Sequence, residues 1–179
     1  MQKTILIISS SPRKGGNSDL LCDAFARGAH ESGHSTEKIY LQGKKIGFCM
    51  ACYACKKDGN CIQKDDVAAI LEKMAGADVI VLATPVYYYS MTGQLKTLID
   101  RTLPCYYTKK ISGKDVYGIV TAAEEKPALE RTVDGLRGFV ECLPDATLKG
   151  VVYGAGVYEK GEIKDKPAMR EAFLMGRNS

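Results

Sequence analysis

This sequence of 179 residues lacks three features that would place it in a special class of protein. No apolar stretch comes near the roughly 20 residues that a membrane-spanning helix needs. The basic residues form nothing longer than pairs such as Lys44-Lys45, and the net charge of +4 is mild. Histidine is scarce, and both copies, His30 and His34, flank the end of a predicted helix. We therefore expect no membrane contact, no nucleic-acid partner and no histidine metal site.

Internal repeats and low-complexity linkers are also missing, so nothing in the sequence marks a domain boundary. With 45% hydrophobic and 26% charged residues, the composition is that of an ordinary globular protein. The length fits one domain, which we predict to span residues 1–179. The apolar run at residues 5–8 is too short for the core of a signal peptide, and no small-residue cleavage site follows it. We therefore expect a cytoplasmic protein.

Short apolar runs rich in β-branched residues alternate with segments of helical periodicity. The runs lie at residues 5–8, 36–41, 79–83, 116–120 and 148–153. Continuous apolar runs of this length are typical of parallel strands that are covered on both faces. Four segments between the runs, and a fifth after the last run, repeat apolar residues at helical spacing. This order predicts a doubly wound, three-layer α/β fold in which ligands bind beyond the carboxyl ends of the strands.

The loop after the first predicted strand reads SSSPRKGGNS (residues 9–18). It matches neither the Walker phosphate loop nor the dinucleotide fingerprint. Its hydroxyls, its arginine and its glycine pair nevertheless lead into the start of a helix, where free amides and the helix dipole favour an anion. The alternative is an ordinary polar turn that caps the helix.

The loop after the third predicted strand contains three consecutive tyrosines, Tyr87, Tyr88 and Tyr89. They cannot all enter the core, and they offer flat, amphipathic surface where a planar ligand should bind. The alternatives are a subunit interface or a loop that packs on its own aromatic rings. After the fourth strand, small residues from Thr121 to Ala123 allow a close approach but specify no ligand on their own.

Four of the seven cysteines, Cys49, Cys52, Cys55 and Cys61, lie close together in the sequence. A secreted disulfide framework would spread its pairs along a shorter chain, so metal or redox chemistry is favoured. Zinc sites usually take two separated pairs of ligands. The spacing is closer to a bacterial iron-sulfur run, although its last gap is longer and Ile62 replaces the proline. A cluster, a disulfide and free thiols all remain open.

Three stretches together resemble the flavodoxin-like NAD(P)H-dependent FMN reductases. Residues 8–18 are similar to the phosphate loop of that family, and residues 84–101 are similar to its flavin-ring loop and the following helix. Residues 49–66 resemble the cysteine-containing part of the iron-sulfur flavoprotein branch. The chain departs from the pattern at Ser10, where the family has glycine, and after the fourth strand, where glycines are missing. The resemblance implies a flavodoxin-like fold with a five-stranded parallel sheet in the order 2-1-3-4-5 and a cysteine-rich insertion at about residues 47–64.

The resemblance also implies a set of site residues. The FMN phosphate would be held by Ser11, Arg13, Asn17 and Ser18. The isoalloxazine ring would be lined by Pro85, Val86, Tyr87, Tyr88 and Ser90, with Thr121 and Ala122 at its other edge. A [4Fe-4S] cluster would be held by Cys49, Cys52, Cys55 and Cys61. The flavin carries out the hydride chemistry itself, so no catalytic side chain is assigned.

These expectations lead to an FMN-dependent oxidoreductase that passes electrons from NAD(P)H to a flavin, quinone, nitro compound or metal ion. An alternative is an FMN/[4Fe-4S] electron-transfer flavoprotein that works between redox protein partners, although the mild positive charge does not suit an acidic carrier. A flavin-free binding or regulatory module is a third reading. We also expect a homo-dimer or homo-tetramer, because a flavin on so small a domain would leave one ring face open and because Tyr106 and Tyr107 add further loop aromatics.

Overall fold

The computed structural model describes residues 1–179 and contains a five-stranded parallel sheet in the order β2-β1-β3-β4-β5. The strands are β1 (Thr4–Ser9), β2 (Ser35–Tyr40), β3 (Val79–Pro85), β4 (Asp115–Thr121) and β5 (Thr147–Gly154). The predicted fold and strand order are confirmed. The central strands β1, β3 and β4 are almost wholly buried, whereas the residues of the edge strands β2 and β5 are mostly exposed or partly buried. This difference explains why the central strands are the clearest apolar runs in the sequence.

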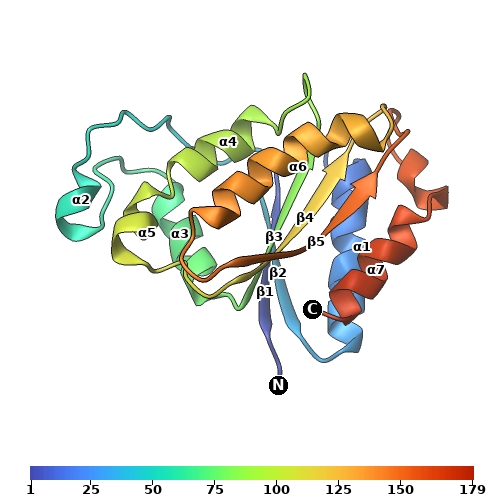
Figure 1. Cartoon of the computed structure of the whole chain (residues 1–179), viewed down its shortest axis with the longest axis horizontal. Coiled ribbons are helices and arrows are strands. Elements are labelled where there is room, and N and C mark those ends of the chain that lie inside the picture. Colours follow the sequence, from blue (N-terminus) through green and yellow to red (C-terminus); the bar gives the residue numbers. More distant parts are fainter.

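Helices cover both faces of the sheet (Figure 1). One face carries α1 (Asn17–Glu31) and α7 (Ala168–Arg177), and the other carries α3 (Val67–Gly76), α4 (Gly93–Asp100) and α6 (Lys126–Glu141). Successive strand residues point to opposite faces. In β1, Ile5 and Ile7 therefore pack with α1 and α7, while Leu6 and Ile8 pack with the other helices.

Two glycines allow α1 and α7 to cross at very short range. A Cβ atom on Gly28 would lie 1.9 Å from the carbonyl oxygen of Phe173, and a Cβ atom on Gly176 would lie 2.0 Å from the carbonyl oxygen of Phe25. Real side chains never come this close to backbone atoms. The crossing of the two helices therefore requires glycine at both positions.

Three short helical elements were not predicted: α2 (Cys55–Asp58), α5 (Leu103–Thr108) and the 3₁₀ helix η1 (Glu162–Asp165). The helical pattern of the sequence extends to Thr102, and Tyr106 and Tyr107 are expected in a loop, but α4 ends at Asp100 and both tyrosines lie in α5, which begins at Leu103. Pro104 lies in the first turn of α5, where a missing N–H group costs nothing, and it could not continue the hydrogen-bond ladder of α4.

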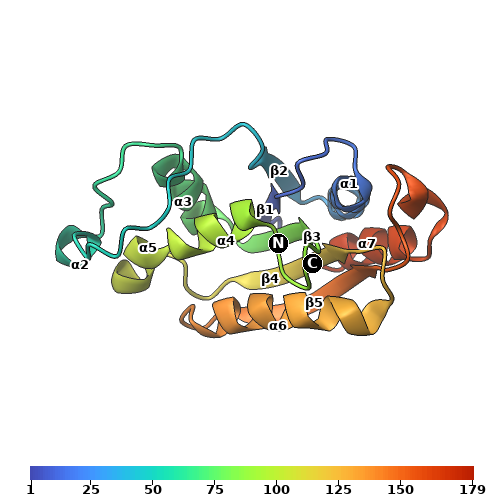
Figure 2. The ribbon, with the colours of Figure 1, turned by 90° about the horizontal axis from the view of Figure 1, so that it is seen from above.

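The chain between β2 and α3 contains the cysteine-rich insertion, which we call the cysteine segment (residues 47–64). Figure 2 looks onto the carboxyl-end edge of the sheet and shows this chain reaching beyond α4 and α5, at the end of the molecule away from α1 and α7. None of the helices in the structure has the length and apolar character required to span a membrane.

Candidate functional site

A cavity of about 330 Å³ lies at the carboxyl ends of β1, β3 and β4. This volume is within the range of small-molecule and cofactor sites. All the residues predicted to contact a flavin line the cavity, except Ser90. The predicted residues on its wall are Ser11, Arg13, Asn17, Ser18, Pro85, Val86, Tyr87, Tyr88, Thr121 and Ala122. These residues therefore lie together at the carboxyl edge of the sheet, where parallel sheets bind ligands.

The loop between β1 and α1 wraps tightly around the start of α1. The Oγ atom of Ser11 accepts a hydrogen bond from the Arg13 N–H group at 3.1 Å, and the Gly16 N–H group donates to the Arg13 carbonyl at 3.0 Å. A Cβ atom on Gly16 would lie 2.9 Å from that same carbonyl oxygen. Glycine at this position thus keeps the turn compact directly before α1, whose first amides have no partner within the helix.

The side chain of Asn17 braces the segment that follows β5. Its Nδ2 group donates to the Glu159 carbonyl at 2.9 Å, and its Oδ1 atom accepts from the Gly161 N–H group at 3.0 Å. Arg13 donates from Nη1 to the Tyr158 carbonyl at 3.4 Å. The amide of Asn17, which the resemblance assigned to a phosphate, is therefore engaged with neighbouring backbone in this structure.

The same segment supplies cavity residues that sequence reasoning missed: Val157, Tyr158 and Lys160. In the sequence, the glycines at 154 and 156 indicate only a turn, because no long helix follows them directly. The signal was nevertheless available, since β5 also ends at the carboxyl edge of the sheet. Gly16, Tyr89, Ala123, Glu124 and Ala128 complete the lining.

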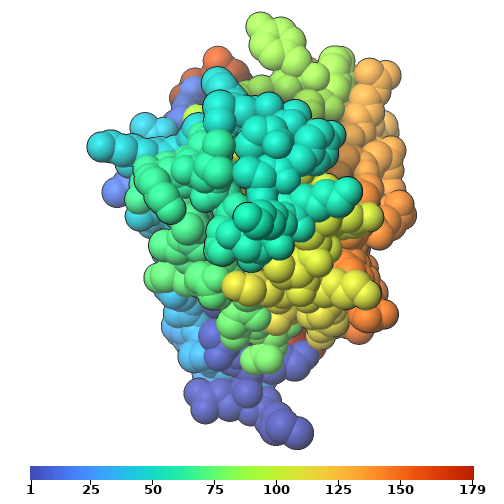
Figure 3. Space-filling model, turned by 90° about the vertical axis from the view of Figure 1, so that its left-hand side faces the viewer, coloured from blue at the N-terminus to red at the C-terminus, as the bar shows by residue number.

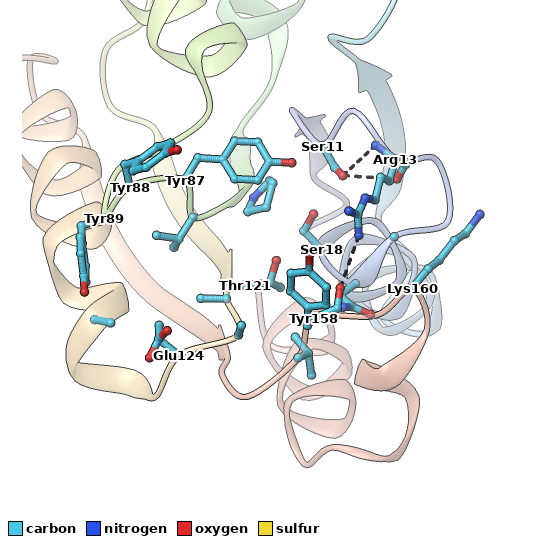
Figure 4. A pocket seen from close by; sticks show the side chains of 18 residues that line it. Ser11, Arg13, Ser18, Tyr87, Tyr88, Tyr89, Thr121, Glu124, Tyr158 and Lys160 are labelled. Carbon is cyan, nitrogen blue, oxygen red and sulfur yellow. Dashed lines mark hydrogen bonds between the residues drawn. The ribbon is translucent and has the colours of Figure 1, made fainter.

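The two ends of the cavity differ in chemistry. One end combines the start of α1 with the basic side chains of Arg13 and Lys160. The Lys160 side chain lies against Gly15, since a Cβ atom added to that glycine would be 3.2 Å from Lys160 Cε. Figure 4 shows the rings of Tyr87 and Tyr158 directed into the space between this end and the tyrosine loop (residues 87–90). Tyr88 and Tyr89 lie farther from Arg13. The arrangement suits a ligand with an anionic end and a flat aromatic end.

The tyrosine loop closes in a tight turn between Tyr87 and Ser90. The Tyr87 N–H group donates to the Ser90 carbonyl at 2.9 Å, and the Ser90 N–H group donates to the Tyr87 carbonyl at 3.1 Å. Tyr88 and Tyr89 have φ angles of +50° and +62°. Both angles are left-handed, a turn type that favours asparagine and glycine. Two tyrosines are therefore held here in strained conformations.

Replacing Tyr88 by asparagine should stabilise the ligand-free protein. The left-handed conformation costs an ordinary residue about 1 to 2 kcal/mol, and Tyr88 is fully exposed, so its ring contributes no packing. We expect Tyr88→Asn to raise the free energy of unfolding by about 1 kcal/mol in urea titrations. The control, Tyr106→Asn in α5, replaces another exposed tyrosine in a helical conformation and should be neutral or destabilising. A loss of stability in Tyr88→Asn would contradict the strain argument.

The four cysteines of the cysteine segment line a second, much smaller cavity of about 20 Å³ next to the end of α4. Figure 3 looks at this end of the molecule, where the segment (teal) lies against α5 (yellow). All four cysteines are free thiols. The donor set suits an iron-sulfur cluster. The cavity, however, has room for about one water molecule, and no three such side chains are arranged around one point as metal ligands.

A buried arginine holds the ends of the cysteine segment together. Arg101 is only 1% exposed, and its Nη1 group donates to Asp65 Oδ2 and to the Gly47 carbonyl, both at 2.7 Å. Its Nη2 group donates to Asp65 Oδ1 at 3.1 Å and to Cys61 Sγ at 3.4 Å. Asp65 also accepts from the Gly47 N–H group at 3.0 Å.

Burial alone would raise the pKa of Asp65, but the hydrogen bonds from Arg101 and from the backbone amides of Gly47 and Val67 outweigh it, so the pKa lies below its ordinary value. Burial likewise opposes the charge on Arg101, and its bond to Asp65 outweighs that effect, so the pKa of Arg101 is raised. The pair is therefore fully ionised at neutral pH.

The sheet order and the cavity at its carboxyl edge define a flavodoxin-like α/β protein. The sequence model of the NADPH-dependent FMN reductases matches residues 4–156. The chain belongs to this family, as its phosphate-loop and tyrosine-loop motifs indicated.

Among characterised relatives, the chain is similar to an iron-sulfur flavoprotein of Archaeoglobus fulgidus, with 39% identity over 123 residues that cover 67% of this chain and 55% of the relative. An iron-sulfur flavoprotein of Methanocaldococcus jannaschii is 36% identical over 135 residues, which cover 75% of this chain and 70% of the relative. The chain spans about half the length of several such relatives.

Among solved structures, the NAD(P)H:quinone oxidoreductase from Methanothermobacter marburgensis superposes with a TM-score of 0.80 over 99% of this chain and 96% of that chain. Its sequence identity is only 17%, so this likeness establishes the fold alone.

Proposed function

We propose that the chain binds FMN non-covalently in the cavity of about 330 Å³ and passes electrons from NAD(P)H to an acceptor. The observation that carries this proposal is the cavity itself, which joins the start of α1 and Arg13 to a wall of tyrosines and small residues. Membership of the NADPH-dependent FMN reductase family supports the same assignment. Bound FMN would supply the hydride chemistry, for which it needs no acid or base from the protein.

The side chains of the cavity bind and orient the ligand. The first amides of α1, the guanidinium of Arg13 and the buried hydroxyl of Ser18 form the end that suits a phosphate. Tyr87 and Tyr158 offer aromatic faces to a flat ring, and Ala122 leaves room beside it. We assign no catalytic residue.

Loss of both Arg13 and Ser18 side chains should weaken FMN binding strongly. Each contact to a phosphate is worth about 1 to 3 kcal/mol, so Arg13→Ala/Ser18→Ala should raise the Kd of FMN at least about thirtyfold. Titration with quenching of flavin fluorescence measures this Kd. Lys14→Ala is the control, because the Lys14 ammonium lies over the Tyr40 ring, 5.2 Å from its centroid, and does not line the cavity. A double variant that binds FMN as tightly as the parent would refute the site.

The activity itself is tested by steady-state oxidation of NADH and NADPH by the FMN-loaded protein. Free flavin, a quinone, a nitro compound and a ferric chelate serve as alternative acceptors. Turnover with any of them supports the reductase, and the relative rates identify its acceptor class. A protein that binds FMN but oxidises neither nicotinamide with any acceptor is not a reductase.

A second candidate is an FMN/[4Fe-4S] electron-transfer flavoprotein. The observation that favours it is the placement of four thiols at one end of α4, whose other end follows the tyrosine loop. The eight residues of α4 rise only about 12 Å along its axis. The archaeal relatives are named iron-sulfur flavoproteins, which supports the same candidate. Because the small cavity would have to open around a cluster, we derive no electron path through it.

Iron content tests this second candidate. Anaerobic purification should give about four irons per chain, and Cys52→Ala should abolish the iron while FMN remains bound. Cys142→Ala, which removes an exposed cysteine outside the cysteine segment, should leave the iron unchanged. Protein that stays free of iron after attempted reconstitution would leave only the simple reductase.

We further propose a homo-dimer or homo-tetramer located in the cytoplasm. Exposed aromatic side chains support an interface, since Tyr88 is 101% and Tyr106 is 54% exposed. Seven free thiols suit a reducing compartment. Light scattering of the FMN-loaded protein at micromolar concentration tests the assembly, and a monomer there would refute it.

A further inference from the structure

A buried carboxylate lies directly beneath the loop that we assign to the phosphate. Asp19, in the first turn of α1, is only 2% exposed. Its Oδ2 atom accepts hydrogen bonds from the Gly15 N–H group at 2.7 Å and from the Tyr40 hydroxyl at 3.3 Å. Its Oδ1 atom accepts from Lys38 Nζ at 2.7 Å. Asp19 thus connects the loop to β2, which lies outside the cavity.

The contact to Gly15 occupies one of the backbone amides that precede α1. Gly15 has a left-handed φ angle of +66°, and its N–H group donates to Asp19. The next amide, that of Gly16, donates to the Arg13 carbonyl. With these two N–H groups engaged inside the turn, the free donors at the start of α1 belong to the residues that follow. The hydrogen bond to Asp19 therefore holds the loop between β1 and α1 in place at Gly15.

The position of this carboxylate calls for charge compensation, because a bare negative charge here would repel an anionic ligand. Lys38 provides it, since its ammonium bonds both Asp19 and Asp23. Burial would lower the pKa of Lys38, but the hydrogen bonds with Asp19, Asp23 and Tyr40 outweigh that effect and the pKa is raised. Lys38 therefore stays charged at any pH at which the protein is handled.

We propose that Asp19 is the positioning residue of the phosphate loop: its carboxylate holds Gly15 in the left-handed conformation that receives the phosphate of FMN, while Lys38 offsets part of the negative charge. Asp19 itself does not line the cavity and touches no ligand. The inference rests on the proposed binding of FMN. It predicts that Asp19 matters for the phosphate and not for the flavin ring.

The comparison of FMN with riboflavin tests this inference, because riboflavin has the same ring system without the phosphate. Asp19→Asn removes the charge and leaves one acceptor oxygen for three donors. We expect its Kd for FMN to rise at least about tenfold, with the Kd for riboflavin unchanged within about twofold. The matched control is Asp23→Asn, which removes the other carboxylate bonded to Lys38. Asp23 has no hydrogen bond to Gly15. Both of its affinities should stay within about twofold of the parent.

Two results with Asp19→Asn would overturn this inference. Equal losses of FMN and riboflavin in Asp19→Asn would reveal general support of the fold, and unchanged FMN affinity would remove the positioning role; either result overturns the inference. If Asp19→Asn does not fold, Gly15→Ala tests the same loop, since alanine is strained at this φ angle. It should weaken FMN and spare riboflavin, and unchanged affinities would again overturn the inference. A parent protein that binds no FMN refutes the proposed function instead.

Discussion

Gly28→Ala should be among the most destabilising single-methyl substitutions in this protein. The added Cβ atom would lie 1.9 Å from the Phe173 carbonyl oxygen, and both atoms belong to helix backbones that cannot rotate away. To relieve the clash, α7 must move off α1, which opens the core on that face of the sheet. We expect the free energy of unfolding to fall by about 3 kcal/mol or more.

The control for this prediction is the same substitution in another helix. Gly138→Ala lies in α6, where an added Cβ atom meets nothing within 4 Å. Alanine is favoured over glycine in helices, so this variant should gain about 0.5 to 1 kcal/mol. Urea unfolding of the two variants therefore gives opposite signs. A neutral Gly28→Ala would show that the helices can separate at little cost.

The sequence predicts the layers of this fold well and its close contacts poorly. The central strands are recognisable because burial on both faces leaves continuous apolar runs such as residues 79–83. Gly28 is also recognisable on the apolar face of its helix, but nothing local shows that Gly176 lies opposite. The crossing depends on two helices at opposite ends of the chain, which periodicity within either helix cannot reveal.

The sequence likewise predicts one part of the candidate site and misses another. The loops after β1 and β3 were predicted because their residue types indicate a ligand at the expected edge of the sheet, whereas Thr121 and Ala122 after β4 were predicted from the family resemblance. Tyr158 and Lys160 were missed because the segment after β5 has no such motif and reaches the cavity through contacts with Arg13 and Asn17. The positions of these residues follow from tertiary hydrogen bonds with partners about 145 residues away along the chain.

Arg101→Met should cost more stability than the loss of any exposed ion pair. Methionine keeps much of the side-chain volume but leaves the carboxylate of Asp65 without its partner. Because Arg101 and Asp65 are 36 residues apart in the sequence, no local structure replaces the contact. Breaking one side of a buried pair costs about 3 to 5 kcal/mol. The control is Lys96→Met, whose exposed pair with Asp100 should contribute no more than about 0.5 kcal/mol.

A double variant separates the lost attraction from the cost of the stranded charge. Asp65→Asn removes that charge, so Arg101→Met/Asp65→Asn should be more stable than the sum of the two single variants predicts. Strict additivity would mean that the two side chains do not interact energetically.

Acid sensitivity provides an independent check on the same pair. The pKa of Asp65 lies below its ordinary value of 3.8, so folding favours the ionised carboxylate. Its contribution to stability is complete above about pH 4 to 5 and is lost as the pH falls through the lowered pKa of the folded state. The difference in unfolding free energy between the parent and Asp65→Asn should therefore shrink below that pH. Because Arg101 also bonds Gly47 and Cys61, the same acid range should loosen the cysteine segment. Protection from hydrogen exchange, measured relative to the intrinsic rate at each pH, should therefore fall there before it falls in the central strands.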